Sequence, residues 1–139
     1  MTINALFDST SNLLVKTAQL RSHKAEVIAS NIANLDTPGY KAKNFEFAKQ
    51  LQTASATSTN PLLMTATNAN HFGRSNNLNS IQGNITIKTN PLGGLDGNSV
   101  NLDQEMADQA INNGAYARAM QMLKSKMAIL KNAIVEGGK

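Results

Sequence analysis

Side chains that could carry chemistry are sparse in this chain of 139 residues. The two histidines, His23 and His71, lie far apart in the sequence, and neither has a cluster of other metal-ligating residues beside it. A zinc site needs three or four closely placed ligands, so we expect none here. The sequence contains no cysteine, which excludes a disulfide framework, a thiolate metal site and a cysteine nucleophile.

Three acidic residues, Asp103, Glu105 and Asp108, could form an acid–base pair or a cation site. They stand at the start of a long helical pattern, where the helix dipole favours negative charge, and we interpret them as a helix start. Gly93-Gly94 and Asp96-Gly97 lack the spacing and the preceding strand of a phosphate-binding loop. We therefore expect no catalytic residue, no cofactor and no metal, in a protein that is not an enzyme.

The composition favours a protein that buries polar surface against neighbours. Charged residues make up only 16% of the chain and aromatic residues 4%, which leaves a thin core. The net charge of +4 is scattered, without the dense, aromatic-interleaved patch of a nucleic-acid binder. The N-terminal residues do not resemble a secretory signal peptide. No apolar run approaches the ~20 residues of a membrane span, so we expect no membrane insertion.

Two long helices, one toward each end of the chain, would position everything else. Leu6, Leu13, Leu20 and Val27 lie seven apart, which predicts an amphipathic helix up to about residue 35. Asp8 and Ser9 are candidate N-caps, and an earlier start near Asn4 stays open. From residue 102 to residue 134, apolar residues recur in steps of three or four, which predicts a second helix more than 30 residues long. Asn101 or Asp103 can cap this helix, and Gly137-Gly138 ends it.

The long periodic patterns favour a coiled coil. The predicted fold is mainly α, with the N- and C-terminal helices paired as an antiparallel coiled coil and an irregular, short-β, flexible middle. The residues expected to pair the helices are Leu13, Leu14, Leu20, Val27, Ile28 and Ile32 on one side, and Met106, Met120, Leu123, Met127, Leu130 and Ile134 on the other. Gly114 costs the second helix roughly 1 kcal/mol relative to Ala, which favours a close backbone approach there.

The middle of the chain has weaker patterns. Residues 41–51 predict a short strand followed by a helical turn, and residues 85–89 alternate as a strand does. Residues 53–60 are nearly low-complexity and predict a flexible linker. We therefore divide the chain into a discontinuous helical inner domain, residues 1–35 and 100–139, and an outer segment, residues 36–99, made of a turn, irregular or short-strand structure and flexible chain.

The first helix ends in a corner whose residues are the most specific in the chain. Thr37-Pro38-Gly39-Tyr40 fits a type II turn, with Pro at the second position and Gly at the third. Asn31 and Asn34 precede it in the last helical turn. The corner resembles the signature S-N-[IL]-A-N-x-x-T-x-G-[YF] of the bacterial flagellar rod and hook protein family. The matching residues are Ser30, Asn31, Ile32, Ala33, Asn34, Asp36, Thr37, Pro38, Gly39 and Tyr40.

Residues 20–29, 41–47 and 95–106 extend the resemblance, and they look most like the proximal rod members of that family. The resemblance implies a structural subunit of the flagellar basal body, exported without a cleavable signal by the flagellar type III apparatus. It further implies helical assembly in the periplasmic space as part of the drive shaft for motility. The implied partners are other copies of the chain, other rod proteins, and the adaptor between the rod and the inner-membrane ring.

Several alternatives stay open. The chain could be another axial component such as the second proximal rod protein, or a cytoplasmic coiled-coil adaptor; a nucleic-acid binder is disfavoured by the scattered charge. The corner has two interpretations. Asn31, Asn34 and the rigid turn could set the angle between the inner helix and the outer segment, or they could simply terminate a helix.

Overall fold

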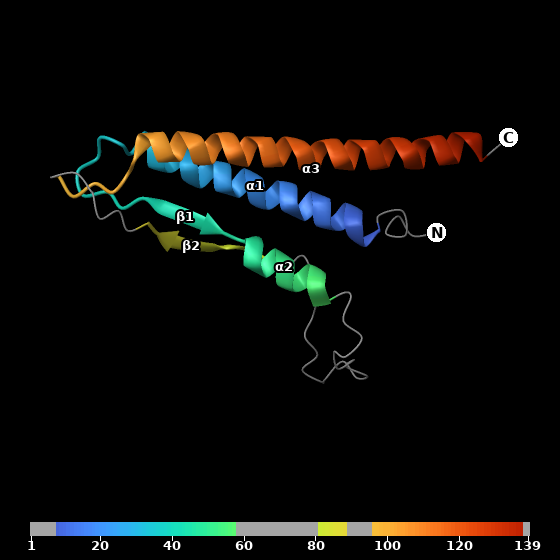
Figure 1. Cartoon of the computed structure of the whole chain (residues 1–139), viewed down its shortest axis with the longest axis horizontal. Helices are drawn as coiled ribbons and strands as arrows, with labels where there is room; N and C mark the ends of the chain where they lie inside the picture. The colour runs from blue at the N-terminus through green and yellow to red at the C-terminus, as the bar shows by residue number, and fades with distance from the viewer. Residues whose placement is uncertain (1–7, 58–80, 89–95, 138–139) are drawn as a thin grey trace.

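The computed structural model describes residues 8–57, 81–88 and 96–137. Within these residues the chain forms three helices and a two-stranded sheet: α1 (Ser9–Ala33), β1 (Lys43–Glu46), α2 (Ala48–Thr57), β2 (Asn84–Ile87) and α3 (Leu102–Glu136). Figure 1 shows α1 and α3 lying side by side in opposite directions, with the sheet and α2 beside α1. This arrangement confirms the predicted mainly α fold with paired terminal helices and a short-β middle.

The ends of both long helices follow from local side chains. The carboxylate of Asp8 accepts hydrogen bonds from Ser11 N, at 2.9 Å, and from Ser11 Oγ, at 3.0 Å, and so caps α1. Asn101 Oδ1 accepts from Gln104 N at 3.2 Å and caps α3. At the other end of α3, the backbone N–H of Gly137 bonds to Ala133 O. Asp8 and Asn101 are both caps that the sequence predicts.

One face of α1 packs against the sheet. Leu20 is buried together with Phe45, Phe47 and Ile81, and Val27 packs partly buried against this cluster. The Phe45 and Phe47 rings lie 5.7 Å apart, within the range of favourable aromatic pairs. Burying a side chain of this size is worth about 1.5–3 kcal/mol, so these few residues account for much of the hydrophobic stabilisation between α1 and the sheet.

The other face of α1 contacts α3 through small and polar side chains. Glu105, Asn112, Ala119 and Lys126 follow each other at seven-residue intervals along α3, and we call them the polar seam. The first three are buried. Hydrogen bonds cross the seam from Arg21 to Asn112 in both directions: Asn112 Nδ2 donates to Arg21 O at 2.9 Å, and Arg21 Nη1 donates to Asn112 Oδ1 at 3.5 Å. The heptad spacing is that of a coiled coil, but its contact row is not apolar.

The residues predicted to pair the two helices differ in how far they are buried in the single chain. Leu20 and Ile28 are buried, and Leu13, Leu14, Val27, Ile32, Leu123, Met127 and Leu130 are half-buried. Met106, Met120 and Ile134 remain 58%, 41% and 66% exposed, so they contribute little to pairing in the single chain. The apolar pattern lies beside the contact row rather than on it, because the contact row itself carries a carboxylate and an amide.

The sheet confirms both predicted strands. β1 and β2 pair antiparallel, with Lys43 opposite Ile87 and Glu46 opposite Asn84. The linker predicted over residues 53–60 is wrong at its start, because α2 continues to Thr57. Thr53 Oγ1 donates to Lys49 O at 2.9 Å, and the alanines that follow are strong helix formers. Residues 58–60 and the remaining middle, 61–80 and 89–95, lie outside the described residues.

The long helices do not have the character of membrane spans. Among the described helices, none combines the length and apolarity needed to cross a bilayer. Polar seam residues interrupt the apolar sequence of α3, and Arg21 and Lys24 interrupt that of α1.

Candidate functional site

Three segments meet at the corner where α1 ends and α3 begins (Figure 1). They are the last turn of α1, residues 37–42, and residues 96–101, which lead into α3. Tyr40 N donates to Thr37 O at 3.3 Å, and Gly39 has a φ of +72°. A glycine with positive φ at the third position is what the type II turn expected here requires. We call this meeting point the junction.

Asn98 joins the end of α1 to the segment before α3. Its buried Nδ2 lies within hydrogen-bonding distance of three carbonyl oxygens, those of Asn34 at 3.0 Å, Leu35 at 2.7 Å and Thr37 at 2.9 Å. Its Oδ1 accepts from Val100 N at 2.8 Å. These carbonyls belong to the C-cap residue of α1 and to the turn that follows it, so Asn98 anchors the end of α1 from a segment more than 60 residues away in sequence. No pattern in the sequence around Asn98 indicates this role.

Asn31 connects three elements from within α1. Its Nδ2 donates to Lys43 O at 2.7 Å and to Glu105 Oε2 at 3.1 Å, while its Oδ1 accepts from Lys43 N at 2.9 Å. The amide therefore pairs with both backbone groups of a β1 residue and reaches α3 as well. Asn31 is fully buried, and a buried amide with these partners fixes the relative positions of α1, β1 and α3.

Lys88, just after β2, ties the sheet to α3. Its Nζ lies 2.8 Å from Glu105 Oε1 and 2.9 Å from Asp108 Oδ2. Glu105 is only 1% exposed. Partial burial disfavours the charged form of Lys88, but the hydrogen bonds and charges of the two carboxylates outweigh that and raise its pKa. Glu105 and Asp108 thus have a structural partner that their position at a helix start did not indicate.

A short run of hydrogen bonds joins the turn to the segment before α3. Gly39 N donates to Asp96 O at 3.0 Å, Ser99 N donates to Tyr40 O at 3.0 Å, and Ser99 Oγ accepts from Ala42 N at 2.8 Å. Lys41 Nζ donates to Gly97 O at 2.7 Å. Together with the hydrogen bonds of Asn98, these bonds connect residues 37–42 to residues 96–101 at several positions.

The remaining signature residues have different surroundings. Asn34 Nδ2 donates to Ser30 O at 2.8 Å, and Asn34 Oδ1 accepts from Thr37 Oγ1 at 3.2 Å, both at the surface. Tyr40 OH lies 3.4 Å from Asn31 Oδ1. Ile32 is half-buried, whereas Ala33, Asp36 and Pro38 are exposed. The junction therefore brings together Asn31, Asn34, Thr37, Gly39 and Tyr40.

The chemistry of the junction is that of holding backbone in place. Its polar groups are amides, hydroxyls and a partly buried ion pair that are bonded to one another or to main chain. In the part of the chain that the structure describes, no three His, Asp or Glu side chains lie close enough to hold a metal ion. The described arrangement can transmit position and force between α1, the sheet and α3.

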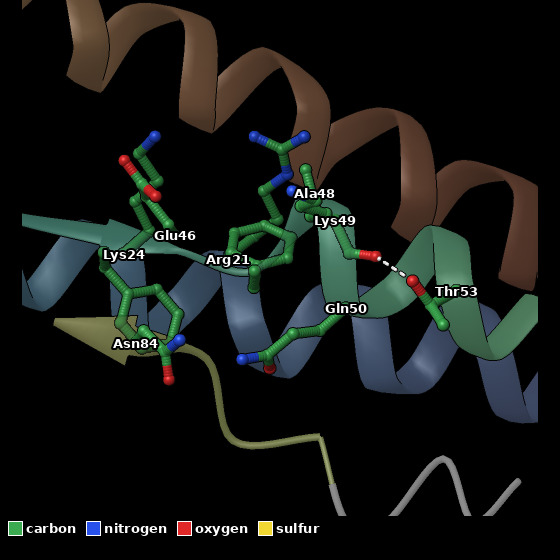
Figure 2. A pocket seen from close by; sticks show the side chains of 10 residues that line it. Arg21, Lys24, Glu46, Ala48, Lys49, Gln50, Thr53 and Asn84 are labelled. Atoms are coloured by element: carbon green, nitrogen blue, oxygen red, sulfur yellow. Dashed lines mark hydrogen bonds between the residues drawn. The ribbon is translucent and has the colours of Figure 1, made fainter.

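A second feature is a hollow between α1, the end of β1 and the start of α2. Figure 2 shows Arg21, Lys24 and Lys49 around it. The guanidinium of Arg21 lies 5.2 Å from the centre of the Phe47 ring, a cation–π contact. Burial, followed by the nearby positive charge of Arg118, lowers the pKa of Arg21. These residues come from separate elements, so no local sequence pattern groups them.

Comparisons with known proteins agree with the resemblance carried by the corner. A family model described as flagella basal body rod protein matches residues 12–41. The flagellar basal body rod protein FlgB of Aeromonas hydrophila is 33% identical over 130 residues, which cover 92% of this chain and 94% of that relative. The FlgB proteins of Salmonella typhimurium and Escherichia coli K12 are each 30% identical, over 86% and 85% of this chain and 87% of each relative.

Proposed function

Because the chain belongs to the family of flagellar basal body rod proteins FlgB, we propose that it is a structural subunit of the proximal rod. In this proposal the flagellar type III apparatus exports the chain without cleavage of a signal peptide. It then assembles helically in the periplasm, against other copies of itself, other rod proteins and the adaptor to the inner-membrane ring. Its activity is mechanical rather than enzymatic.

The observation that best supports an assembled state is the outer surface of α3. Ile111, Met122 and Ile129 are 66%, 60% and 68% exposed in the single chain, and their spacing places them on one side of the helix. We call these three residues the outer α3 face. Met106, Met120 and Ile134 add exposed apolar area elsewhere around α3. A helix that is apolar on several sides is typical of one enclosed by other helices.

The junction supports a division of labour within the subunit. We propose that residues 1–35 and 100–139 form the inner domain that packs around the rod axis, and that residues 36–99 form the outer segment. Asn31, Asn98 and the Lys88–Glu105 pair would then hold the outer segment at a fixed angle to the inner helices. Torque passes through a rod only if its subunits keep their shape, and these bonds stiffen the connection between the two parts.

Leu123→Asp tests the assembly. Leu123 is half-buried on α3, and a charge there disfavours helix packing between α1, α3 and neighbouring subunits. We expect the variant to be exported but to yield no rods, as measured by immunoblots of exported protein and electron microscopy of isolated basal bodies. Leu123→Met, which conserves volume, should assemble normally. Normal rods containing Leu123→Asp would overturn the proposed role of the helix pair.

The cytoplasmic adaptor is the alternative from another class. It predicts a chain that stays in the cytoplasm as a stable helical dimer. Immunoblots of isolated wild-type basal bodies distinguish the two: the chain is present at the level of the rod if the proposal holds, and its absence would overturn it.

A further inference from the structure

The hollow beside α2 is positively charged over an aromatic floor. Arg21 and Lys24 come from α1 and Lys49 from α2, and Phe45 and Phe47 line the same hollow; Figure 2 shows the three cations around it. We call Arg21, Lys24 and Lys49 the basic hollow. Both phenylalanines are almost fully buried, so the floor is rigid while the charged ends of the cations remain near the surface.

The charges of the basic hollow are not neutralised within the described chain. Neither Lys24 nor Lys49 forms an ion pair with any residue in the described ranges. Arg21 Nε is buried and has no hydrogen-bond partner there. The hollow also includes Glu46, whose Oε1 accepts a hydrogen bond from Asn44 Nδ2 at 3.0 Å. Three cations against one carboxylate leave a net positive charge that fits an acidic ligand.

Exposed carboxylates lie beside the junction, one after the end of α1 and one in the first turn of α3. Asp36 and Asp103 are exposed, and within the described residues neither forms an ion pair. We call them the acidic corner. Asp36 follows the end of α1, whereas Arg21 lies 12 residues before that end, which is about 18 Å along the helix. Since α1 is a continuous helix between them, a chain cannot place its own corner in its own hollow.

We propose that the basic hollow of one copy receives the acidic corner of the neighbouring copy in the rod. This rests on the proposed function, because it requires copies of the chain to lie side by side. The two surfaces differ, so the contact is head-to-tail, and a head-to-tail contact generates rings or helices rather than closed pairs. Charge complementarity then sets the register of neighbouring copies, while the apolar surface of α3 supplies most of the contact area.

Cysteine cross-linking tests the contact directly, because the chain has no cysteine of its own. Asp36→Cys and Lys49→Cys are placed together in one chain, and basal bodies from cells producing it are treated with a short bifunctional thiol reagent. We expect a ladder of cross-linked copies. Each single variant should give none, and Asp36→Cys with Lys131→Cys, an exposed lysine on α3 outside the hollow, should give none either.

Charge exchange provides a second, independent measurement. Lys49→Glu and Asp36→Lys should each lower the number of copies per basal body roughly fivefold, because attraction is replaced by repulsion. The double variant should restore most of that loss. Both residues are exposed, so the fold is preserved, and circular dichroism checks this.

The outcomes separate the contact from the proposed function. In the first outcome, the wild-type chain is present in basal bodies, but there is no ladder and charge reversal has no effect. This result overturns the contact and leaves the rod function intact. In the second outcome, Lys49→Glu lowers the number of copies per basal body, Asp36→Lys does not restore it, and no ladder forms. This result overturns the assignment to a second copy and indicates a different acidic partner. Wild-type chain absent from basal bodies overturns the rod function itself.

Discussion

Asparagine side chains make the connections at the corner where the two long helices meet. Asn31 is buried and its side chain reaches β1 and α3, whereas the side chain of Asn34 bonds to Ser30 and Thr37 at the surface. An amide has both a donor and an acceptor, so it can pair with the N–H and the C=O of a passing chain at once. Asn31 does this with Lys43, whereas Asn98 donates to carbonyls at the end of α1 and accepts from Val100 N in its own segment.

This difference predicts unequal effects for two residues of the same signature. Asn31→Ala leaves the backbone N–H and C=O of Lys43 without their side-chain partner, and we expect it to lower the free energy of unfolding by about 2–3 kcal/mol. Asn34→Ala should cost about 1 kcal/mol or less, since water can replace its bonds. Urea unfolding followed by circular dichroism measures both. Equal losses would mean that the signature acts only as a helix terminus.

Rod assembly is the second measurement on these two variants. If the junction sets the angle between α1 and the outer segment, Asn31→Ala should give defective rods even at temperatures where the variant is folded. A variant that is destabilised but builds normal rods would contradict that role.

Asp8 carries a pH dependence of its own. Its carboxylate pairs with Lys126 across the two helices, and this hydrogen bond, together with that from Ser11 N, lowers the pKa of Asp8 from 3.8 to about 2. A carboxyl whose pKa is lower in the folded state stabilises the fold above its unfolded pKa. The contribution of Asp8 should therefore be lost as the pH falls from about 4 to about 2.

Comparison with Asp8→Asn isolates this contribution. Asparagine still caps a helix but does not titrate, so the loss of unfolding free energy between pH 4 and pH 2 should be smaller in the variant than in the parent. Added salt should shrink the difference between the two proteins at pH 7, because the pair is at the surface. Identical acid profiles would show that Asp8 is not paired in solution.

At the scale of elements, what can be predicted from the sequence depends on how local the cause is. The helix caps, the turn at Gly39 and the two strands follow from neighbouring residues, and the structure has them where the sequence places them. Two other features join segments that are distant in sequence: the pairing of β1 with β2, and the hydrogen bond from Asn98 to the end of α1. Nothing in their local patterns specifies a partner, so the sequence alone did not give them.

The polar seam could not be predicted from the sequence for a different reason. Helix pairing is inferred from apolar repeats, and the row formed by Glu105, Asn112, Ala119 and Lys126 contains one apolar residue. Glu105 at a helix start is also explained by the helix dipole. Its burial follows only from the positions of Asn31 and Lys88, which other elements supply.

The ion pair of Lys88 and Glu105 should control how firmly the sheet is attached to α3. Lys88→Met leaves the buried carboxylate of Glu105 without its cation, and we expect a loss of about 2–3 kcal/mol, less than for a fully buried pair because Lys88 is partly exposed. Adding Glu105→Gln removes the unpaired charge and should recover part of this loss. Urea unfolding of the single and double variants gives the coupling free energy, and additive effects would contradict the pair.

At the scale of the whole molecule, the described elements contact the longest helix, α3, mainly along the side that faces α1. The seam covers the side of α3 that contacts α1, while Ile111, Met122 and Ile129 stay open on another. A subunit with so much unsatisfied apolar surface gains stability when neighbours cover it, so folding and assembly are coupled. This coupling is consistent with the proposed role of a rod subunit that assembles with neighbouring copies.

Replacing Gly114 should have opposite effects on the stability of the isolated chain and on rod assembly. A Cβ built at Gly114 meets only Arg118 Nη1, at 3.6 Å, which is an ordinary contact. Nothing within the described chain therefore requires glycine at this point of α3. Gly114→Ala should raise the free energy of unfolding of the isolated chain by about 0.5–1 kcal/mol, as alanine does for glycine inside a helix.

In the rod we expect the opposite effect of the same substitution. A glycine kept in mid-helix at a cost to stability points to a neighbouring backbone that packs against it in the assembly. Gly114→Ala should then give a more stable chain that builds fewer rods, measured by thermal unfolding and by counting basal bodies in electron micrographs. Asn113→Ala, an exposed neighbour, should also favour the helix but leave rod number unchanged. Normal rods with Gly114→Ala would show that no neighbouring backbone approaches α3 at this residue.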